Sequence, residues 1–323
     1  MVEDRKALTT RSELINLYLI YSLSERNIMS RQPLALAMVQ SPAESLESFA
    51  EGLKQRVKAN PNVALFVYPE LHLCSLGAAD ADSYAEFTEA MAEPLDGPRG
   101  QVLAQLAGDL GIWLVPGSVH ERADDGTVYN TAVAYSPEGK LVASYRKIFP
   151  RRPVETVASG TEFVVFDMPG YGRVGLSICY DSWFPEHARH LAWKGAELIL
   201  NVVATDTADR TSEITIARAN AIVNQVFFAS VNGAGPWSHG RSLLADPSGR
   251  VRIDSNSNEA IVLTEVIDLD EVSNTRRFGT ASVSRPWDFF AETEESIDLP
   301  LYSGNMSASR WGETASRLSS LEV

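Results

Sequence analysis

The chain has 323 residues, of which 45% are hydrophobic and 22% charged, a composition typical of a soluble globular protein with one large α/β domain or two small ones. The formal net charge of −14 argues against a nucleic-acid partner, because phosphates require a basic surface. With only two cysteines, Cys74 and Cys179, the chain has no disulfide framework, and a reducing, cytoplasmic setting fits best.

The N-terminal region contains one apolar stretch, Leu14–Leu23. This stretch is too short to span a bilayer, it is flanked by Glu13 and Glu25, and no small-residue cleavage site follows it. We therefore expect no transmembrane segment and no membrane partner. Residues 1–32 are predicted to form an N-terminal helical extension that docks on the body of the protein or on another subunit.

Strands and helices alternate from residue 33 onward. Pro33–Gln40 is predicted to be an apolar strand, and Ser41–Glu44 has the pattern of a capping box with proline at the first helical position. The helix that follows ends near Asn60, and a second strand returns over Val63–Glu70. A β-α-β unit of this kind is typical of a layered α/β sheet.

The same alternation continues to residue 268 without a linker or a repeat, which predicts one domain over residues 33–284. Residues 285–323 have no strong pattern but contain several aromatic residues, so we expect a C-terminal tail that packs at a subunit interface. The remaining predicted elements are a helix at 98–110, a strand at 112–118, hairpins at 131–147 and 163–179, a helix at 185–194, a strand at 197–203, a helix at 210–224, a strand at 226–232, a hairpin at 242–254 and a strand at 260–268.

The stretch 172–189 carries the clearest chemical signal. Its apolar run, Val174–Ile178, predicts a buried strand, and Cys179 follows directly, shortly before a helix that Pro185 can begin. Ligands bind at strand ends in open α/β sheets, and helix N-termini favour thiolates. Cys179 is therefore a candidate nucleophile, although this stretch alone is equally consistent with a buried structural cysteine.

Three charged residues complete a candidate set, two of them at the end of a predicted strand and the third close behind. Glu70 follows a strand in VYPELHL, Lys147 follows one in SYRKIFP, and Glu155 lies eight residues after Lys147. Each of them alone is consistent with an ordinary surface side chain. Together with Cys179 they form a set of an acid, a cation, a second acid and a thiol.

This set resembles the catalytic residues of the nitrilase superfamily of carbon–nitrogen hydrolases, which are Glu, Lys, a second Glu and Cys. The resemblance spans roughly residues 33–268 and rests on FVYPE, YRKIFP and ICYDSWFPEHAR in the correct order, with LLADPSGR as a later match. It implies an α/β fold of the four-layer αββα sandwich type, a homo-oligomer (a dimer or higher), a small-molecule amide substrate, and no cofactor or metal.

Within the superfamily, YRKIFPRRPVE is similar to the aliphatic amidases, and YDSWFPE resembles amidases and carbamoyl-amide hydrolases more than nitrilases. The expected function is an amidase that converts a small amide to a carboxylate and ammonia through a cysteine thioester. Nitrile hydrolysis, N-carbamoyl amide hydrolysis, acyl transfer to an amine and a non-catalytic family member are the alternatives. Arg151 and Arg152 depart from the amidase pattern, and they are expected either to pair with local acids or to bind a substrate carboxylate.

The chemistry and the resemblance together assign a role to each residue. Cys179 attacks the carbonyl carbon, and Glu70 takes the thiol proton, returns it to the departing ammonia and activates the hydrolytic water. Lys147 and the backbone N–H of Tyr180 stabilise the oxyanion. Glu155 keeps Lys147 charged and in place.

Several other polar residues are weaker candidates. Glu121 is an alternative second acid, and Asp181 is expected to cap the turn after the cysteine. Trp183, Trp237 and His239 are candidates for the pocket wall. No metal-ligand spacing connects the five histidines, which are His72, His120, His187, His190 and His239.

Overall fold

The computed structural model describes residues 31–74, 81–279 and 283–287. The predicted N-terminal extension (residues 1–32), including the stretch Leu14–Leu23, and most of the predicted tail (residues 285–323) lie outside these ranges, so both remain predictions. Among the described residues, no helix combines the length and the apolar character needed to cross a membrane.

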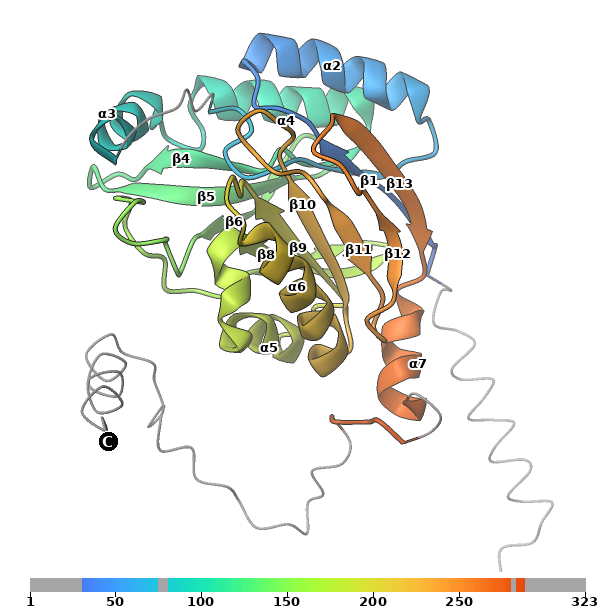
Figure 1. The fold of residues 1–323 in the computed structure, drawn as a ribbon. Helices are drawn as coiled ribbons and strands as arrows, with labels where there is room; N and C mark the ends of the chain where they lie inside the picture. Colours follow the sequence, from blue (N-terminus) through green and yellow to red (C-terminus); the bar gives the residue numbers. More distant parts are fainter. Residues whose placement is uncertain (1–30, 75–80, 280–282, 288–323) are drawn as a thin grey trace, which may run out of the picture.

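Two sheets pack face to face in the centre of the molecule (Figure 1). In the described part of the chain, the first sheet has seven strands in the order β13-β1-β2-β3-β5-β4, with β6 paired to β5. These strands are β1 (Leu34–Gln40), β2 (Leu65–Val67), β3 (Trp113–Val115), β4 (Ser118–Arg122), β5 (Val128–Tyr135), β6 (Leu141–Arg146) and β13 (Ile261–Ile267).

The second sheet has six strands within the described residues, in the order β12-β11-β10-β9-β8-β7. Its central strands β8, β9 and β10 are parallel, so their carboxyl ends lie along one edge of the sheet. The strands are β7 (Val165–Met168), β8 (Gly172–Ile178), β9 (Leu198–Val203), β10 (Phe227–Asn232), β11 (Leu243–Ala245) and β12 (Val251–Asp254).

Helices form the two outer layers. In Figure 1, α2 and α4 cover the first sheet, and α5 and α6 cover the second. The predicted four-layer αββα sandwich is therefore confirmed. The helices are α2 (Leu46–Ala59), α3 (Ala81–Met91), α4 (Pro98–Leu110), α5 (Pro185–Trp193), α6 (Arg210–Asn224) and α7 (Asp270–Phe278), with a short 3-10 helix η1 (Cys179–Trp183) before α5.

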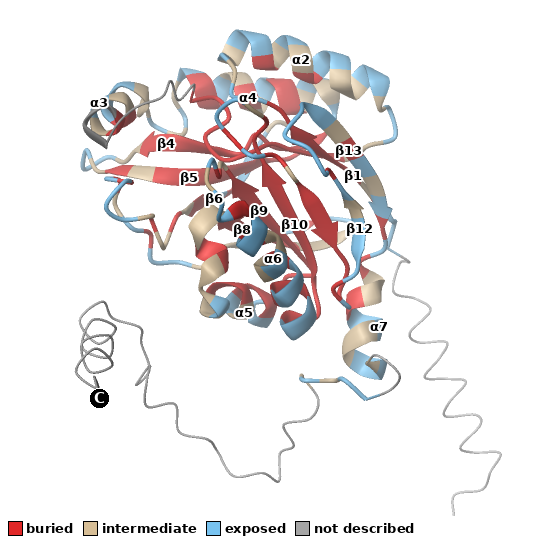
Figure 2. Ribbon diagram, viewed as in Figure 1, coloured by how far each residue is buried: buried red, intermediate tan, exposed pale blue. Residues whose placement is uncertain are grey.

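The inner strands of both sheets are continuous apolar runs because both of their faces are buried, whereas β6, β12 and β13 are partly exposed. In β1, Leu36 and Met38 join the core between the sheets, whereas Ala37 and Val39 pack under α2 and α4. The same alternation of side chains along a strand recurs in β9. Figure 2 shows the result, with buried strands between helices whose outer faces are exposed.

The structure corrects the predicted start of α2. Ser45 is the N-cap, and its side chain accepts a hydrogen bond from the backbone N–H of Ser48. The predicted capping box at Ser41–Glu44 is wrong, because Glu44 instead contacts Nε2 of His72 at 2.9 Å. Three further elements, α3, β4 and α7, were not predicted from the sequence.

Trp287 is the first aromatic residue of the predicted tail, and it packs on its own chain. Its indole N–H donates to the carbonyl oxygen of Asn224 at 3.1 Å. The guanidinium groups of Arg189 and Arg276 lie 4.9 and 5.0 Å from the ring centroid. The start of the tail is thus anchored to α5, α6 and α7 of the same subunit.

Candidate active site

The site forms where strand ends of the two sheets meet. Glu70 follows β2 of the first sheet, and Cys179 follows β8 of the second. Glu70 connects the two sheets directly, because its backbone N–H donates to the carbonyl oxygen of Val203 at 3.3 Å and its Oε2 accepts from the backbone N–H of Ala204 at 3.1 Å. Both of these partners lie at the end of β9.

Lys147 lies between two carboxylates. Its Nζ donates to Oε1 of Glu70 at 2.9 Å and to Oε1 of Glu155 at 2.8 Å, and all three side chains are buried. Glu70 Oε1 also accepts from Asn130, and Glu155 Oε2 accepts from the backbone N–H of Arg151. These hydrogen bonds satisfy the buried charges, which would otherwise be costly in the interior.

The three groups titrate as a coupled cluster. Burial raises the pKa of Glu70, with a further increase from Glu155 that Lys147 opposes. The pKa of Glu155 is lowered, because the nearby Lys147 ammonium outweighs the effect of burial, which alone would raise it. The pKa of Lys147 lies well above its ordinary value, because the two carboxylates outweigh the effect of burial, which alone would lower it. Lys147 is therefore charged, and Glu70 is the carboxylate better suited to accept a proton.

Cys179 occupies a strained turn. Its φ angle is +46°, which L side chains rarely adopt and which costs about 1–3 kcal/mol. Asp181 holds the turn, because its Oδ2 accepts from the backbone N–H of Ile178 and its Oδ1 from that of Phe149, both at 2.9 Å. Asp181 thus caps the turn as expected and also connects it to the loop after Lys147.

The structure does not support an activated thiolate at rest. Burial and the Glu70 carboxylate raise the pKa of the Cys179 thiol well above 9.0, although Lys147 opposes them. The expectation that a helix N-terminus would favour the thiolate is not met, although Cys179 begins η1, because burial and the Glu70 carboxylate outweigh that effect on its pKa. The Cys179 thiol therefore carries its proton, and a reaction at Sγ would require the thiol to lose it.

Cys179, Lys147 and both glutamates line one cavity of about 260 Å³. Cavities that bind small molecules usually begin at about 300 Å³, so this one suits a small ligand. Its described lining residues are Glu70, Lys147, Arg151, Glu155, Cys179, Tyr180, Trp183, Ala204, Thr205, Asp209 and Glu213.

The weaker candidates separate clearly in the structure. Trp183 lines the cavity, but Glu121 lies outside it, where it pairs with Arg146 at 2.6 Å. Trp237 is not among the described lining residues and is 54% exposed. His239 lines a neighbouring cavity instead.

Four residues of the site were missed by sequence reasoning. Thr205 closely follows β9 as Glu70 follows β2, so the rule about strand ends would have found it. Asp209 and Glu213 lie further along, at the N-cap and in the first turn of α6. Asn130 lies inside β5, and no local signal distinguishes it there.

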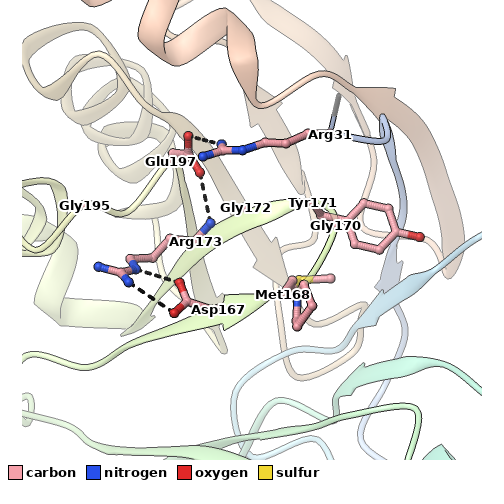
Figure 3. Close-up of a pocket in the computed structure, with 10 residues that line it drawn as sticks. Arg31, Asp167, Met168, Gly170, Tyr171, Gly172, Arg173, Gly195 and Glu197 are labelled. Carbon is pink, nitrogen blue, oxygen red and sulfur yellow. Dashed lines mark hydrogen bonds and ion pairs between the residues drawn. The ribbon is translucent and has the colours of Figure 1, made fainter. Parts of the chain in front are cut away.

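A larger, more open cavity of about 420 Å³ lies near the β7–β8 turn (Figure 3). Its charged groups are already paired with one another, because Arg173 binds Asp167 and Arg31 binds Glu197. No cysteine or lysine is among its described lining residues, so we assign the chemistry to the smaller cavity. The larger cavity is lined by Arg31, Asp167, Met168, Pro169, Gly170, Tyr171, Gly172, Arg173, Gly195 and Glu197.

An αββα sandwich that presents a thiol beside a lysine and two carboxylates is the architecture of the nitrilase superfamily. A family model described as "Carbon-nitrogen hydrolase" matches residues 33–277. The chain therefore belongs to the carbon–nitrogen hydrolase family.

Named relatives agree with this assignment. The chain is 33% identical over 211 residues to omega-amidase NIT2 of Homo sapiens, a match that covers 60% of this chain and 75% of the relative. It is 30% identical over 258 residues to a formamidase of Bacillus thuringiensis, covering 75% and 76% of the two chains. Its fold is similar to Nit3 of Saccharomyces cerevisiae, with a TM-score of 0.67, 26% identity and coverage of 76% and 94%. The chain is a carbon–nitrogen hydrolase, and amide hydrolysis is the activity that the family supports.

Proposed function

We propose that this carbon–nitrogen hydrolase converts a small amide to a carboxylate and ammonia, with Cys179 as the nucleophile. The observation that carries the proposal is the position of Lys147 between Glu70 and Glu155, at 2.9 and 2.8 Å, in the cavity that Cys179 lines. This arrangement supplies a nucleophile, a proton acceptor and an oxyanion partner in one small space.

In the first step, Sγ of Cys179 attacks the amide carbonyl carbon, and the thiol proton moves to Glu70. A raised pKa suits Glu70 for this transfer, because a carboxylate of ordinary pKa is a weak base at neutral pH. Transfer during attack is also what a neutral resting thiol requires.

The carbonyl oxygen then carries the negative charge of the tetrahedral intermediate. Lys147 is the cation nearest to Glu70 and Glu155 in the cavity, and it stabilises this charge. The backbone N–H of Tyr180 is the proposed second donor, because the first N–H groups of a helix such as η1 have no intrahelical partner.

Collapse of the intermediate breaks the carbon–nitrogen bond. Glu70 returns the proton to the leaving nitrogen, ammonia departs, and a thioester remains on Cys179. Glu70 then takes a proton from water, whose oxygen attacks the thioester carbonyl carbon. The second intermediate collapses to the carboxylic acid, and the proton on Glu70 restores the thiol.

Glu155 acts through Lys147. Its carboxylate accepts from Nζ and from the backbone N–H of Arg151, which keeps it ionised and fixed. It thereby holds the ammonium in position and maintains the charge of Lys147 while Glu70 is protonated.

For the substrate, we infer an acyl group that ends in a carboxylate. Arg151 lines the cavity, and its charge helps to lower the pKa of Glu155, but no salt bridge joins its side chain to another described residue. Arg152 has a structural position instead, because it donates to the carbonyl oxygens of Glu155 and Val157. The name omega-amidase, carried by several relatives, agrees with an amide at the far end of such a molecule.

We further propose that the protein is a cytoplasmic homo-oligomer. Its two cysteines are unpaired, as a reducing compartment requires. Trp193, Ile222 and Val223 are 77%, 48% and 44% exposed on α5 and α6, an apolar surface suited to a second copy of the chain. Sedimentation of a Trp193→Asp variant tests the assembly, and an unchanged oligomer mass would exclude this face as the interface.

A product screen tests the reaction itself. Short amides with and without a terminal carboxylate, the matching nitriles and the matching ureido compounds are incubated with the enzyme. Ammonia release from the amides alone, together with an acyl-enzyme mass on the Cys179 peptide, is the expected result. Turnover of the nitrile or the ureido compound in preference to the amide would replace the proposed substrate class.

A further inference from the structure

A second hydrogen-bond chain reaches the nucleophile from β9 and α6. Sγ of Cys179 lies 3.8 Å from Oγ1 of Thr205, and that oxygen lies 2.8 Å from both carboxylate oxygens of Glu213. Thr205 and Glu213 are buried, and both line the catalytic cavity. The catalytic steps proposed above use neither of them.

The proton positions in this chain follow from the donors available. A hydroxyl carries one proton, and an ionised carboxylate can only accept. Glu213 therefore accepts the hydrogen bond that the Thr205 hydroxyl donates. The lone pairs of Oγ1 then remain for Cys179, so the thiol is the donor in the contact between Sγ and Oγ1.

Arg210 holds the Glu213 side chain in place. Its Nη1 lies 3.2 Å from Oε2 of Glu213, and the pair is buried. The other donors of the guanidinium are used as well, by the hydroxyl of Ser230 and by the carbonyl oxygens of Gly240 and Arg241. A guanidinium with so many partners has no freedom to turn away from Glu213.

The backbone of Thr205 is also fixed. Its N–H donates to Oδ1 of Asn232 at 2.9 Å, and its carbonyl oxygen accepts from the backbone N–H of His239 at 2.8 Å. These backbone hydrogen bonds hold Thr205 in the position from which its hydroxyl contacts Cys179.

We propose that Thr205 is a positioning residue for the nucleophile, and that the Glu213–Arg210 pair orients its hydroxyl so that it holds the Cys179 thiol protonated until Glu70 takes the proton. This inference rests on the proposed catalytic use of Cys179. The contact restrains the Cys179 side chain, and the loss of this restraint is what should lower kcat. The Glu213 carboxylate contributes to the raised pKa of the thiol, which agrees with this arrangement.

The first test removes the hydroxyl and keeps the shape of the side chain. Thr205→Val is expected to lower kcat about tenfold, the value of one hydrogen bond at the reacting atom, while KM changes less than about twofold. Thr205→Ser restores the hydroxyl and should recover most of kcat. Thr215→Val, an exposed position on the same helix as Glu213, is the matched control. Wild-type kcat in Thr205→Val would overturn the proposal.

The second test reverses the direction of the hydrogen bonds between Glu213, Thr205 and Cys179. In Glu213→Gln the amide oxygen is expected to face the Arg210 guanidinium, so that the amide N–H donates to Oγ1 of Thr205. This frees the threonine O–H to donate to Sγ, and the substitution also removes a negative charge. Both effects favour the thiolate. The pH midpoint of Cys179 alkylation by iodoacetamide, followed by mass spectrometry of its peptide, should move to lower pH. A midpoint that is unchanged or higher would contradict the proposed orientation.

A double variant shows whether Glu213 acts through Thr205. In a Thr205→Val background, Glu213→Gln should shift the alkylation midpoint less than it does alone, because the hydroxyl that transmits the effect is absent. Equal shifts in the two backgrounds would mean that Glu213 acts independently of Thr205, against the proposal. Alkylation needs no turnover, so its result is separate from the fate of the proposed reaction. Thr205→Val alters no charge and leaves Arg210 paired, so the kcat test stands even where Glu213→Gln fails to fold.

Discussion

The Nζ atom of Lys147 lies 2.8 Å from Oε1 of Glu155, eight residues further along the chain, and both side chains are buried. A loop this short returns the carboxylate to the lysine because the backbone N–H of Arg151 also binds Oε2 of Glu155. The same lysine contacts Glu70 on its other side. Since the buried charges hold one another in place, changing any one of them should affect both the reaction and the stability of the fold.

Cys179→Ala is expected to abolish turnover and leave the fold intact, because it removes only the small side chain that forms the thioester. Activity and the circular dichroism spectrum measure the two effects. In the wild type, iodoacetamide should label Cys179 before Cys74, since Cys74 is fully buried. Undiminished turnover in the alanine variant would exclude the proposed nucleophile.

Glu155→Gln keeps the shape of the side chain and removes the charge beside Lys147. We expect kcat to fall on the order of 10²-fold, as for other preorganised electrostatic groups. Glu121→Gln is the matched control, because Glu121 pairs with Arg146 outside the cavity, and it should cost far less. A reversed order of the two losses would show that Glu121 is the second acid.

The rate should depend on pH through Glu70. Burial raises the pKa of this carboxyl above 4.5, and the ionised form is the one that accepts the thiol proton. As the pH falls through the raised pKa, Glu70 becomes protonated and kcat/KM declines. The acid limb of the kcat/KM profile should therefore have its midpoint above 4.5, a value that belongs to the coupled cluster as a whole. A midpoint at or below 4.5 would contradict Glu70 as the base.

Arg151→Ala should raise KM for amides that carry a terminal carboxylate about tenfold or more and leave KM for neutral amides nearly unchanged, because only the former lose a charge-assisted contact. Arg152→Ala serves as the comparison, since Arg152 binds backbone carbonyls and should affect the melting temperature instead. Equal KM changes for both substrate classes would argue against a carboxylate site at Arg151.

Deletion of residues 288–323 should shift the assembly toward monomer. The deletion keeps Trp287, which packs on its own subunit, so it isolates the part of the predicted tail that lies outside the described residues. Sedimentation of the truncated protein measures the change. An unchanged oligomer mass would mean that the remainder of the tail does not form the subunit contact.

The local sequence determined most of the secondary structure. The helix Pro98–Leu110 and the helix Arg210–Asn224 have the predicted bounds, and the hairpin that delivers Cys179 was predicted from its alternation. Apolar periodicity predicts such elements because it records which faces are buried. The prediction of a capping box at Ser41–Glu44 was wrong, because the Glu44 carboxylate contacts His72, a residue distant in sequence.

The positions at strand ends also identified Glu70, Lys147 and Cys179, because a reactive side chain that closely follows a strand is a local feature of the sequence. Only the tertiary structure decided which strand ends meet. Thr205 lies next to Cys179 because β9 pairs with β8 in the second sheet. Glu70, by contrast, belongs to the first sheet and yet binds Ala204 at the edge of the second. Contacts of this kind depend on how two sheets pack across a shared core, and no pattern along one strand records that register.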